Sequence, residues 1–352
     1  MSIASLKADL NKRFGKNAVV IASEAKGLIV RRFSTGVFAL DEITKGGYPE
    51  GRVVELIGPE HSGKTLLAMR AVRSFLKKHK DALCVWVDTE NTFDPTWAES
   101  NGLDLSRLVV NVPSSGEEGC DLMLASMASD DLVIVVLDSM AMLVPTKDID
   151  KDMEDGKNVG SHPGMITEFV KKLTIAMRTD LTEDKPKSTL IVLNQLRSKI
   201  GMMFGDPESI PGGKAKDHAS SMRIRIRREK WLQEGTKEKK ENVGYNVQFR
   251  VKKTKVGGGI ERTGETEFYF RDVDEHRPFG FNNILALRKS GVMQELIEVQ
   301  GNSYTYGKIK GVGKAFDKAL REDKAATKKL RKDLMAIATK KLGKAPSEEA
   351  GE

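Results

Sequence analysis

The sequence has two cysteines, few aromatic residues and no long apolar run. Cys84 and Cys120 are too few for a disulfide framework, and their spacing matches no metal-binding motif. No stretch approaches the ~20 apolar residues of a membrane helix. The opening run MSIASLKADLNKRFGK has no apolar signal-peptide core, and the five histidines form no ligand cluster. We therefore expect a reduced, cytoplasmic protein with no membrane partner.

The chain is long enough for one large domain and one or two small ones, and its positive charge is unevenly placed. The net charge is +8 over 352 residues. Residues 308–344 hold thirteen Lys and Arg against four Asp and Glu, whereas residues 345–352 contribute −3. A basic terminal lobe is typical of a polyanion-binding surface. A solvated helical face is the alternative, and charge alone does not decide between them.

The strongest motif is the stretch VVELIGPEHSGKT, residues 53–65. A β-branched run leads into a Gly-x-x-x-x-Gly-Lys-Thr loop, and helix-forming residues follow, which is the context that a Walker A phosphate loop requires. Backbone N–H groups and the helix N-terminus favour an anion there. The residues expected to bind a nucleoside triphosphate are Gly58, Pro59, Glu60, His61, Ser62, Gly63, Lys64, Thr65 and Leu66.

Three further apolar runs end in polar residues. LCVWV ends at Asp88-Thr89-Glu90, LVIVVL ends at Asp138, and TLIVL ends at Asn194-Gln195. Continuous apolar strands with helical crossovers indicate a parallel sheet covered on both faces. Since ligands bind outside the carboxyl ends of such strands, we expect these polar side chains to meet the phosphate loop.

Each strand end suits a distinct role in phosphoryl transfer. Asp138 fits a carboxylate of the Mg²⁺ shell, together with the Thr65 hydroxyl. Glu90 fits a carboxylate that orients the attacking water, although a helix N-terminal carboxylate is the structural alternative. Gln195 is placed to sense the γ-phosphate and to pass that state into the loop that follows it.

The run Asp94-Pro95-Thr96-Trp97 completes the expected nucleotide site. Trp97 suits stacking on the base and equally suits a core aromatic, and the sequence leaves both readings open. We include Asp94 and Trp97 among the nucleotide-binding residues.

Two polar, glycine-containing loops are expected at about residues 148–163 and 196–216. The second places Arg197 and Lys199 beside Met203 and Phe204. Exposed basic side chains next to apolar ones suit single-stranded nucleic acid. The cations bind phosphates, and the apolar groups stack on the nucleobases. A plain surface loop is the alternative, but loops of this length are usually functional.

The remaining pattern predicts smaller elements. Residues 2–16 suit a short helix, and a second short helix precedes Gly46-Gly47. Residues 222–227 alternate as a half-buried strand with a basic face and then enter a hydrophilic connection from Arg228. Residues 246–255 form another strand. After about residue 280 we expect helices near 284–287 and 296–297, an aromatic hairpin at 304–306 and a basic helix pair to Leu342.

With these motifs, the sequence resembles the bacterial and phage RecA recombinase family along nearly the whole chain. The generic nucleotide motifs are shared by many P-loop proteins, whereas the second loop with its following Gly-Gly is far more specific. The similar stretches are FGK, STG with Leu40-Asp41, GPEHSGKT, DTENTFDP, VVLDS, NQLRSKIGMMFGDPE, GGKAKDHAS, IRR and VKKTK.

The resemblance implies an α/β fold with a RecA-type P-loop ATPase core, a mostly parallel sheet, an N-terminal helix and a small α+β C-terminal lobe. It divides the chain into 1–33 (protomer docking), 34–275 (core with both loops), 276–345 (basic lobe) and 346–352 (short acidic tail). The implied activity is a DNA-dependent ATPase that uses ATP and Mg²⁺. It would form helical filaments on single-stranded DNA and catalyse homologous pairing and strand exchange in recombinational repair. Double-stranded DNA, other copies of the chain, single-strand-binding proteins and loader proteins are the implied partners.

The resemblance also carries residue roles. Glu90 falls on the family's catalytic glutamate, Gln195 on its ATP-sensing glutamine, and Trp97 where a tyrosine usually meets adenine. Lys253 and Lys255 fall on the pair that reaches the ATP of the adjacent subunit. The implied catalytic set is Glu90, Lys64 and Gln195. The implied DNA-binding residues are Ser161, His162, Gly164, Lys171, Lys172, Arg197, Lys199, Ile200, Met203, Phe204, Glu208, Ser209, Gly212, Gly213 and Lys214.

The sequence departs from the family at several places. Pro163 replaces a methionine of the first DNA loop, Asp217-His218 replaces an aromatic pair, and the acidic tail is short. Two other functions remain as alternatives: a RecA-like ring helicase or ATPase paralogue on single-stranded DNA, and a DNA-binding regulator that does not hydrolyse ATP. The second loop and the N-terminal helix favour an open filament over a ring, and the complete set of ATPase residues argues against the regulator.

Overall fold

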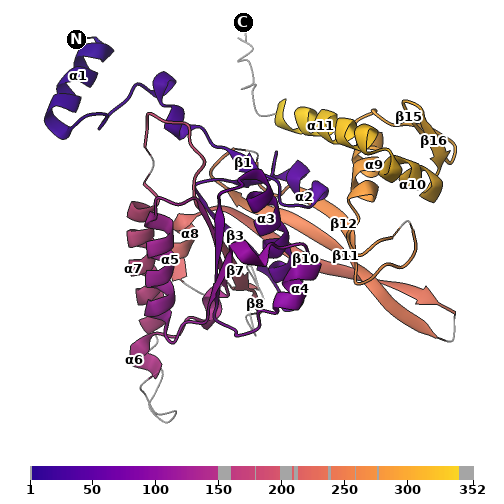
Figure 1. The fold of residues 1–352 in the computed structure, drawn as a ribbon, viewed down its shortest axis with the longest axis horizontal. Coiled ribbons are helices and arrows are strands. Elements are labelled where there is room, and N and C mark those ends of the chain that lie inside the picture. The colour runs from indigo at the N-terminus through magenta and orange to yellow at the C-terminus, as the bar shows by residue number, and fades with distance from the viewer. Residues whose placement is uncertain are drawn as a thin grey trace, which may run out of the picture.

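The fold is built around one large sheet with helices on both faces and a small lobe at one end (Figure 1). The computed structural model describes residues 2–149, 160–178, 180–198, 208–209, 213–236, 239–257, 259–275 and 277–340. Over these ranges, no helix combines the length and the apolar character that a membrane crossing needs.

The large sheet has nine strands in the order β13-β12-β11-β10-β3-β7-β6-β4-β5. The six strands from β10 to β5 run parallel, and β11, β12 and β13 extend the sheet in antiparallel fashion. The predicted α/β fold with a mostly parallel sheet is confirmed. The strands are β3 (Val53–Gly58), β4 (Leu83–Asp88), β5 (Leu108–Asn111), β6 (Val133–Asp138), β7 (Thr189–Gln195), β10 (Ser220–Gly235), β11 (Lys240–Thr254), β12 (Thr263–Tyr269) and β13 (Gly280–Phe281).

Alternate residues of the central strands face two different helix layers. In β6, Ile134 and Val136 join the cluster that contains α3, whereas Val133, Val135 and Leu137 join the cluster formed with α5 and α7. Burial on both faces explains why these strands read as continuous apolar runs. The helices of the core are α2 (Phe38–Ile43), α3 (Lys64–Lys78), α4 (Pro95–Ser100), α5 (Gly116–Ala128), α6 (Thr146–Ile149), α7 (Ser161–Ala176) and α8 (Gly213–Ala219). Four two-residue strands complete it: β1 (Arg32–Phe33), β2 (Tyr48–Pro49), β8 (Arg197–Ser198) and β9 (Glu208–Ser209).

The N-terminal helix α1 (Ile3–Phe14) lies away from the sheet (Figure 1). This helix confirms the one expected over residues 2–16. Ser2 caps it by accepting a hydrogen bond from the backbone N–H of Ser5, and Gly15 ends it. None of its residues is buried, and Ile3 and Phe14 are 67% and 73% exposed. Within the part of the chain that the structure describes, the helix therefore presents exposed apolar side chains.

The segment after Arg228 differs from the sequence prediction. We expected a hydrophilic connection there, but β10 continues to Gly235 and pairs with β11 from Lys240. The prediction was wrong because the outer half of this hairpin is stabilised by cross-strand aromatic packing. Trp231 pairs with Tyr245 across the hairpin, and such pairs stabilise strands whose other residues are polar.

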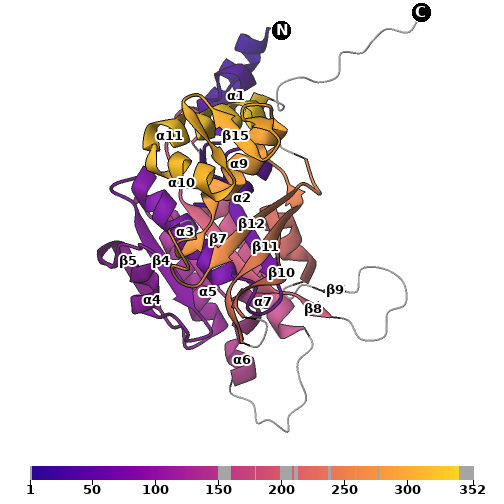
Figure 2. The same ribbon diagram turned by 90° about the vertical axis from the view of Figure 1, so that its right-hand side faces the viewer.

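The C-terminal lobe packs against α2 at one end of the sheet (Figure 2). Its hydrophobic cluster includes Phe38 and Ala39 from α2. The prediction of a helix at Leu296-Ile297 is wrong. The backbone N–H groups of both residues donate to the carbonyl of Gly291, and this turn ends α9. The predicted aromatic hairpin and basic helix pair are confirmed. The lobe contains α9 (Asn283–Met293), β14 (Glu298–Gln300), β15 (Ser303–Tyr306), β16 (Ile309–Val312), α10 (Lys314–Glu322) and α11 (Lys324–Lys340).

Candidate nucleotide and DNA sites

The phosphate loop connects the buried strand β3 to the N-terminus of α3. A Cβ atom on Gly58 would lie 2.6 Å from both the Ile226 carbonyl oxygen and the Ser62 hydroxyl, so only glycine fits. Gly63 has φ +92°, a left-handed conformation that glycine adopts without strain. The loop therefore turns tightly and leaves the first N–H groups of α3 facing outward, which is an anion-binding arrangement.

Lys64 folds back over this loop. Its ammonium donates hydrogen bonds to the Gly58 and Pro59 carbonyls, at 3.1 and 2.8 Å. Burial lowers the pKa of Lys64, while the carboxylates of Asp138 and Glu90 oppose that shift. Because phosphate oxygens accept hydrogen bonds from an ammonium more strongly than carbonyls do, this lysine is placed to clamp a phosphate.

Backbone and side-chain hydrogen bonds join the ends of β4 and β6. The Thr89 N–H donates to the Asp138 carbonyl at 2.8 Å, and the Thr89 hydroxyl bonds the backbone N–H and carbonyl of Ser139, both at 2.8 Å. The buried Asp88 carboxylate accepts three backbone N–H bonds from the loop after β4. These contacts fix the position of Glu90 relative to Asp138.

The three expected strand-end residues lie together. The Glu90 carboxylate accepts hydrogen bonds from the Ser139 hydroxyl at 2.6 Å and from the Gln195 amide at 3.2 Å. The Thr65 hydroxyl donates to the Asp138 carboxylate at 2.9 Å. Burial raises the pKa of Asp138 to about 6; the nearby carboxylate of Glu90 adds to the shift, and the Thr65 hydrogen bond opposes it.

A cleft of about 700 Å³ opens above these residues. Trp97 lines it, is 38% exposed, and packs edge-on against Phe279 with ring centroids 5.7 Å apart. Asp94 does not line the cleft, because its carboxylate caps α4 through the N–H groups of Thr96 and Trp97. Of the residues predicted from the motifs, those that line the cleft are Glu60, His61, Ser62, Gly63, Lys64, Thr65, Leu66, Glu90, Trp97, Asp138 and Gln195.

The cleft is also lined by a group of residues that the sequence did not reveal. Trp231, Tyr245, Phe268 and Phe270, here called the aromatic wall, come from β10, β11, β12 and the residue after β12. Their rings contact one another with centroids 5.4–6.2 Å apart. The Arg228 guanidinium lies 4.3 Å from the Trp231 ring centroid. The only signal in the sequence was the frequency of aromatics in these strands.

Lys253 and Lys255 lie at the end of β11 and do not line this cleft. Their ammonium groups instead donate to the backbone carbonyls of Asp217 and His218 at the end of α8. The Asp217 carboxylate also pairs with Arg223 and, at 3.0 Å, with Lys216. Asp217, one of the positions that depart from the family pattern, therefore accepts from three cations: Lys216, Arg223 and Lys253. Burial alone would raise the pKa of Asp217, but the hydrogen bonds from Arg223 and Lys216 outweigh burial, so the pKa of this carboxyl group is lowered.

A buried polar chain joins β3 and β7 to the same region. The Glu55 carboxylate accepts from the Asn194 amide at 3.2 Å and from the Arg223 guanidinium at 2.7 Å. Lys216 approaches the same carboxylate at 3.5 Å. Since Asn194 precedes Gln195, the chain connects the strand that carries Gln195 to α8, at the far end of the second loop.

The residues expected to bind DNA at or after the first loop lie on α7. Ser161 and His162 were expected within that loop (about 148–163), but the structure places them in the first turn of this helix. Ser161 donates to Asp148, and the His162 ring lies 3.2 Å from the Met140 carbonyl. Gly164 has open space around it. Lys171 and Lys172 lie about 15 Å from Ser161 along the helix axis, and both are exposed. Lys172 pairs with Glu168 at 2.9 Å. The structure therefore does not gather these residues into one cluster.

The second loop is described only at its ends. β8 and β9 pair antiparallel, with Arg197 opposite Ser209 and Ser198 opposite Glu208, so the two ends meet. The backbone alone is described for Arg197, Glu208, Ser209, Gly213 and Lys214. The other expected residues lie outside the described ranges: Lys199, Ile200, Met203, Phe204 and Gly212.

Comparison with known proteins identifies the family. The model of the RecA N-terminal domain matches residues 2–272. Protein RecA of Lactobacillus johnsonii is 34% identical over 299 residues, which cover 85% of this chain and 77% of that protein. Protein RecA of Streptococcus agalactiae is 36% identical over 280 residues, covering 76% and 72%. The chain belongs to the RecA family. It is therefore an ATP-dependent DNA recombinase of recombinational repair, with DNA-dependent ATPase activity.

The residues beside the phosphate loop fit a divalent metal of the kind that accompanies ATP. Among the residues that the structure describes, no group of three or more His, Cys, Asp or Glu side chains is arranged to hold a metal. Thr65 and Asp138 nevertheless offer two hard oxygen ligands 2.9 Å apart beside the phosphate loop. Because Mg²⁺ in phosphate sites is held by few protein oxygens together with phosphates and waters, this donor set fits it.

Proposed function

We propose that this recombinase binds ATP with its triphosphate on the N-terminus of α3 and its base at the aromatic end of the cleft. The loop N–H groups and Lys64 would hold the phosphates. Trp97 and the aromatic wall offer ring faces for the base. The cleft volume of about 700 Å³ is within the range of nucleotide-sized sites.

We infer that Thr65 and Asp138 hold Mg²⁺ when ATP is bound. The metal supplies positive charge to the phosphate oxygens as charge develops on them. Asp138 supports this role because burial and the neighbouring carboxylates raise its pKa, and a cation beside it would favour the ionised form.

The hydrogen bonds of Glu90 carry the proposal for hydrolysis. Ser139 and Gln195 fix its carboxylate at the strand edge next to Asp138. We propose that Glu90 accepts a proton from the attacking water, as a positioned carboxylate can. Gln195 would exchange its contact with Glu90 for one with the γ-phosphate. Since β7 leads directly into β8, that exchange would move the second DNA loop.

The assembly and the DNA contacts are also proposals. Lys253 and Lys255 would reach the ATP of an adjacent protomer, which is supported by their absence from the cleft of their own chain. The exposed apolar side chains of α1 would dock on a neighbour. The two loops, the start of α7 and Lys171 and Lys172 would contact single-stranded and then double-stranded DNA. Residues 1–33 would serve docking, 34–275 the ATPase core, 276–345 the basic lobe and 346–352 the acidic tail.

We further propose a cytoplasmic location, and single-strand-binding and loader proteins as additional partners. The support for both is family membership.

The variant Glu90→Gln tests the proposed mechanism. The amide keeps the size of the side chain and its position but cannot take the proton, so single-stranded-DNA-dependent ATP turnover should fall by about 100-fold or more. Nucleotide binding, measured with a fluorescent ATP analogue, should stay close to that of the unmodified chain. The matched control is Glu99→Gln on the exposed end of α4, which should leave turnover unchanged. If Glu90→Gln loses nucleotide binding instead, Glu90 does not act as the base.

A further inference from the structure

A second cleft of about 590 Å³ lies further along α3, between the core and the C-terminal lobe. Six cationic side chains line it, and none of its described lining residues is acidic. The cations come from β1, α3 and α11, so both the core and the lobe contribute. They are Arg32, Arg70, Arg73, Lys77, Lys78 and Arg331.

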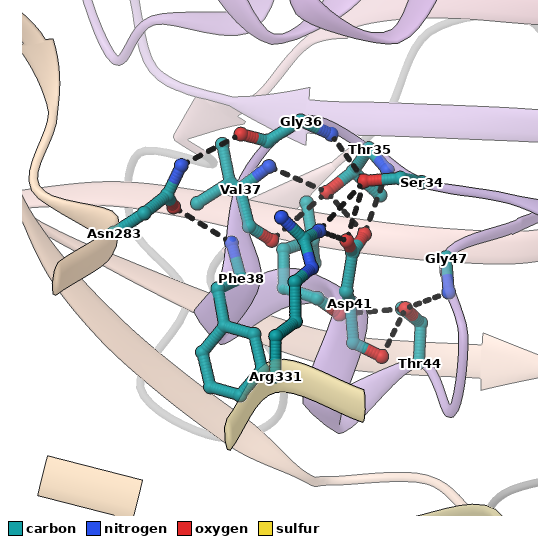
Figure 3. Close-up of polar contacts among 11 residues, drawn as sticks. Ser34, Thr35, Gly36, Val37, Phe38, Asp41, Thr44, Gly47, Asn283 and Arg331 are labelled. Atoms are coloured by element: carbon teal, nitrogen blue, oxygen red, sulfur yellow. Dashed lines mark hydrogen bonds and ion pairs between the residues drawn. The ribbon is translucent and has the colours of Figure 1, made fainter. Parts of the chain in front are cut away.

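Three of these cations already have partners in the chain. Arg331 pairs with the buried Asp41 carboxylate at 2.6 Å (Figure 3). Lys78 pairs with the Glu50 carboxylate at 2.6 Å. Arg32 donates to the backbone carbonyls of Gly47 and Val256. These contacts hold the walls of the cleft in place.

The other three cations have no ion pair or hydrogen bond within the part of the chain that the structure describes. Arg70, Arg73 and Lys77 are spaced by three and four residues, so they share one face of α3. The Arg70 Nε atom is fully buried without a partner, and buried polar atoms without partners are rare in folded proteins. The helix dipole favours Lys77 in the last turn, but it gives no reason for a recessed Arg70.

The two guanidinium groups occupy places that glycines keep open. A Cβ atom on Gly280 would lie 2.7 Å from the Arg70 guanidinium, and one on Gly102 would lie 2.9 Å from that of Arg73. Burial lowers the pKa of Arg70 to about 10, and the charge of Arg73 adds to this effect. An anion between the two side chains would relieve both the burial cost and the repulsion.

We propose that this cleft is a second anion site, which binds a small polyphosphate through Arg70, Arg73 and Lys77. The ligand class is a diphosphate or triphosphate, either inorganic or carried by a nucleotide, because three cations match several phosphate oxygens. A nucleic-acid backbone fits less well, since phosphates of a duplex are met by groups that project from a surface, whereas Arg70 is recessed. The hydroxyl of Ser74 lines the same face of α3 and adds a further hydrogen-bonding group.

This site lies on the same helix as the phosphate loop but does not share its residues. Lys64 and Thr65 line the first cleft, and the second begins about 9 Å further along the helix axis at Arg70. Since Arg331 of α11 lines the second cleft, a bound polyphosphate would connect the lobe to the core. This proposal goes beyond ATP hydrolysis, and its outcome does not depend on the role of Glu90.

Calorimetric titration of inorganic pyrophosphate into the full chain tests the proposal. The nucleotide cleft is first saturated with Mg²⁺ and a non-hydrolysable ATP analogue, so that any further binding reports a second site. We expect one pyrophosphate per protomer. The double variant Arg73→Ala/Lys77→Ala should bind it at least about tenfold more weakly, because each lost charge-assisted hydrogen bond typically costs about tenfold in affinity.

Lys328→Ala/Lys329→Ala is the matched control, because it removes two exposed cations from α11 outside the cleft. It should bind pyrophosphate as the unmodified chain does. The single variant Lys77→Gln, at an exposed position, should give an intermediate loss. No binding to the unmodified chain at millimolar pyrophosphate, or equal weakening in both double variants, would overturn the site.

Two competitors distinguish the source of the phosphates. Tighter binding of ADP than of pyrophosphate would identify a nucleotide, and equal binding would show that the phosphate groups suffice; both results support the site. Displacement of pyrophosphate by a short DNA duplex, lost in Arg73→Ala/Lys77→Ala but kept in the control, would assign the cleft to DNA and overturn the small-ligand proposal.

Discussion

The two halves of α3 differ in whether their polar and cationic side chains have partners within the described chain. At its N-terminus, Lys64 and Thr65 each have a partner within the chain, in the loop carbonyls and in Asp138. Further along, Arg70, Arg73 and Lys77 share one face, and the described residues supply them with no partner. The same helix thus carries one site that is organised in advance and one cationic face that the described residues leave without an ion pair.

This difference shows how to separate a structural cation from a binding one. A charge that only stabilises the fold is expected to have a partner or full contact with solvent, because isolated burial is costly. Arg331 meets the first condition through Asp41, and Lys328 meets the second. Arg70 meets neither, because its Nε is buried without a partner among the described residues. Arg73 and Lys77 are exposed, and they join the proposed site because they share a face of α3 with Arg70.

Lys64→Ala is expected to have the largest effect, since it removes the phosphate clamp from the organised half of α3. ATP turnover with single-stranded DNA should fall by at least about 100-fold, because Lys64 compensates charge that develops on the transferred phosphoryl group. A coupled assay of ADP release measures it. Lys80→Ala, at an exposed position just after α3, should keep normal turnover. Unchanged hydrolysis by purified Lys64→Ala would refute the site assignment.

The organised half was also the part that the sequence predicted best. Glu90, Asp138 and Gln195 were expected to meet because each follows an apolar run, and parallel strands end at a common edge. That inference needs only local patterns and one topological rule. The phosphate loop has a spacing that its chemistry imposes, and it too is readable without knowledge of distant contacts.

The aromatic wall and the second cleft were not predictable in this way. Trp231, Tyr245 and Phe268 become neighbours only through the register of three antiparallel strands. Arg70 and Arg331 are separated by most of the chain and meet because the lobe packs on α2. The local sequence pattern around a charged or aromatic residue does not distinguish a side chain that faces solvent from one that contacts a distant segment.

A second variant tests whether the nucleotide site at the N-terminus of α3 is completed by one chain alone or by two adjacent protomers. Lys253→Ala should reduce ATP turnover only in assembled protein, if its ammonium reaches the ATP of the adjacent protomer. When it is mixed with an equal amount of Lys64→Ala, random assembly leaves about a quarter of the interfaces with both lysines. Turnover in the mixture should therefore recover to about a quarter of that of the unmodified chain.

The mixing experiment needs filaments of normal length, which electron microscopy with single-stranded DNA verifies. Lys252→Ala is the control, because that lysine pairs at 2.9 Å with Glu261 of its own chain, in the connection between β11 and β12, and should not require complementation. No recovery in well-formed mixed filaments would place Lys253 outside the neighbouring nucleotide site.

Arg331→Ala has the smallest expected effect and tests the partnered wall of the second cleft. The buried Asp41 carboxylate would lose its guanidinium but keep its hydrogen bonds from Ser34 and Thr35, at 2.5–2.8 Å. The free energy of unfolding in urea should fall by about 1–3 kcal/mol, because one partner of a buried charge is removed. Lys332→Ala, exposed on the same helix, should change it by less than about 0.5 kcal/mol. A loss in Arg331→Ala no larger than in this control would mean that the Arg331–Asp41 pair does not hold the lobe to the core.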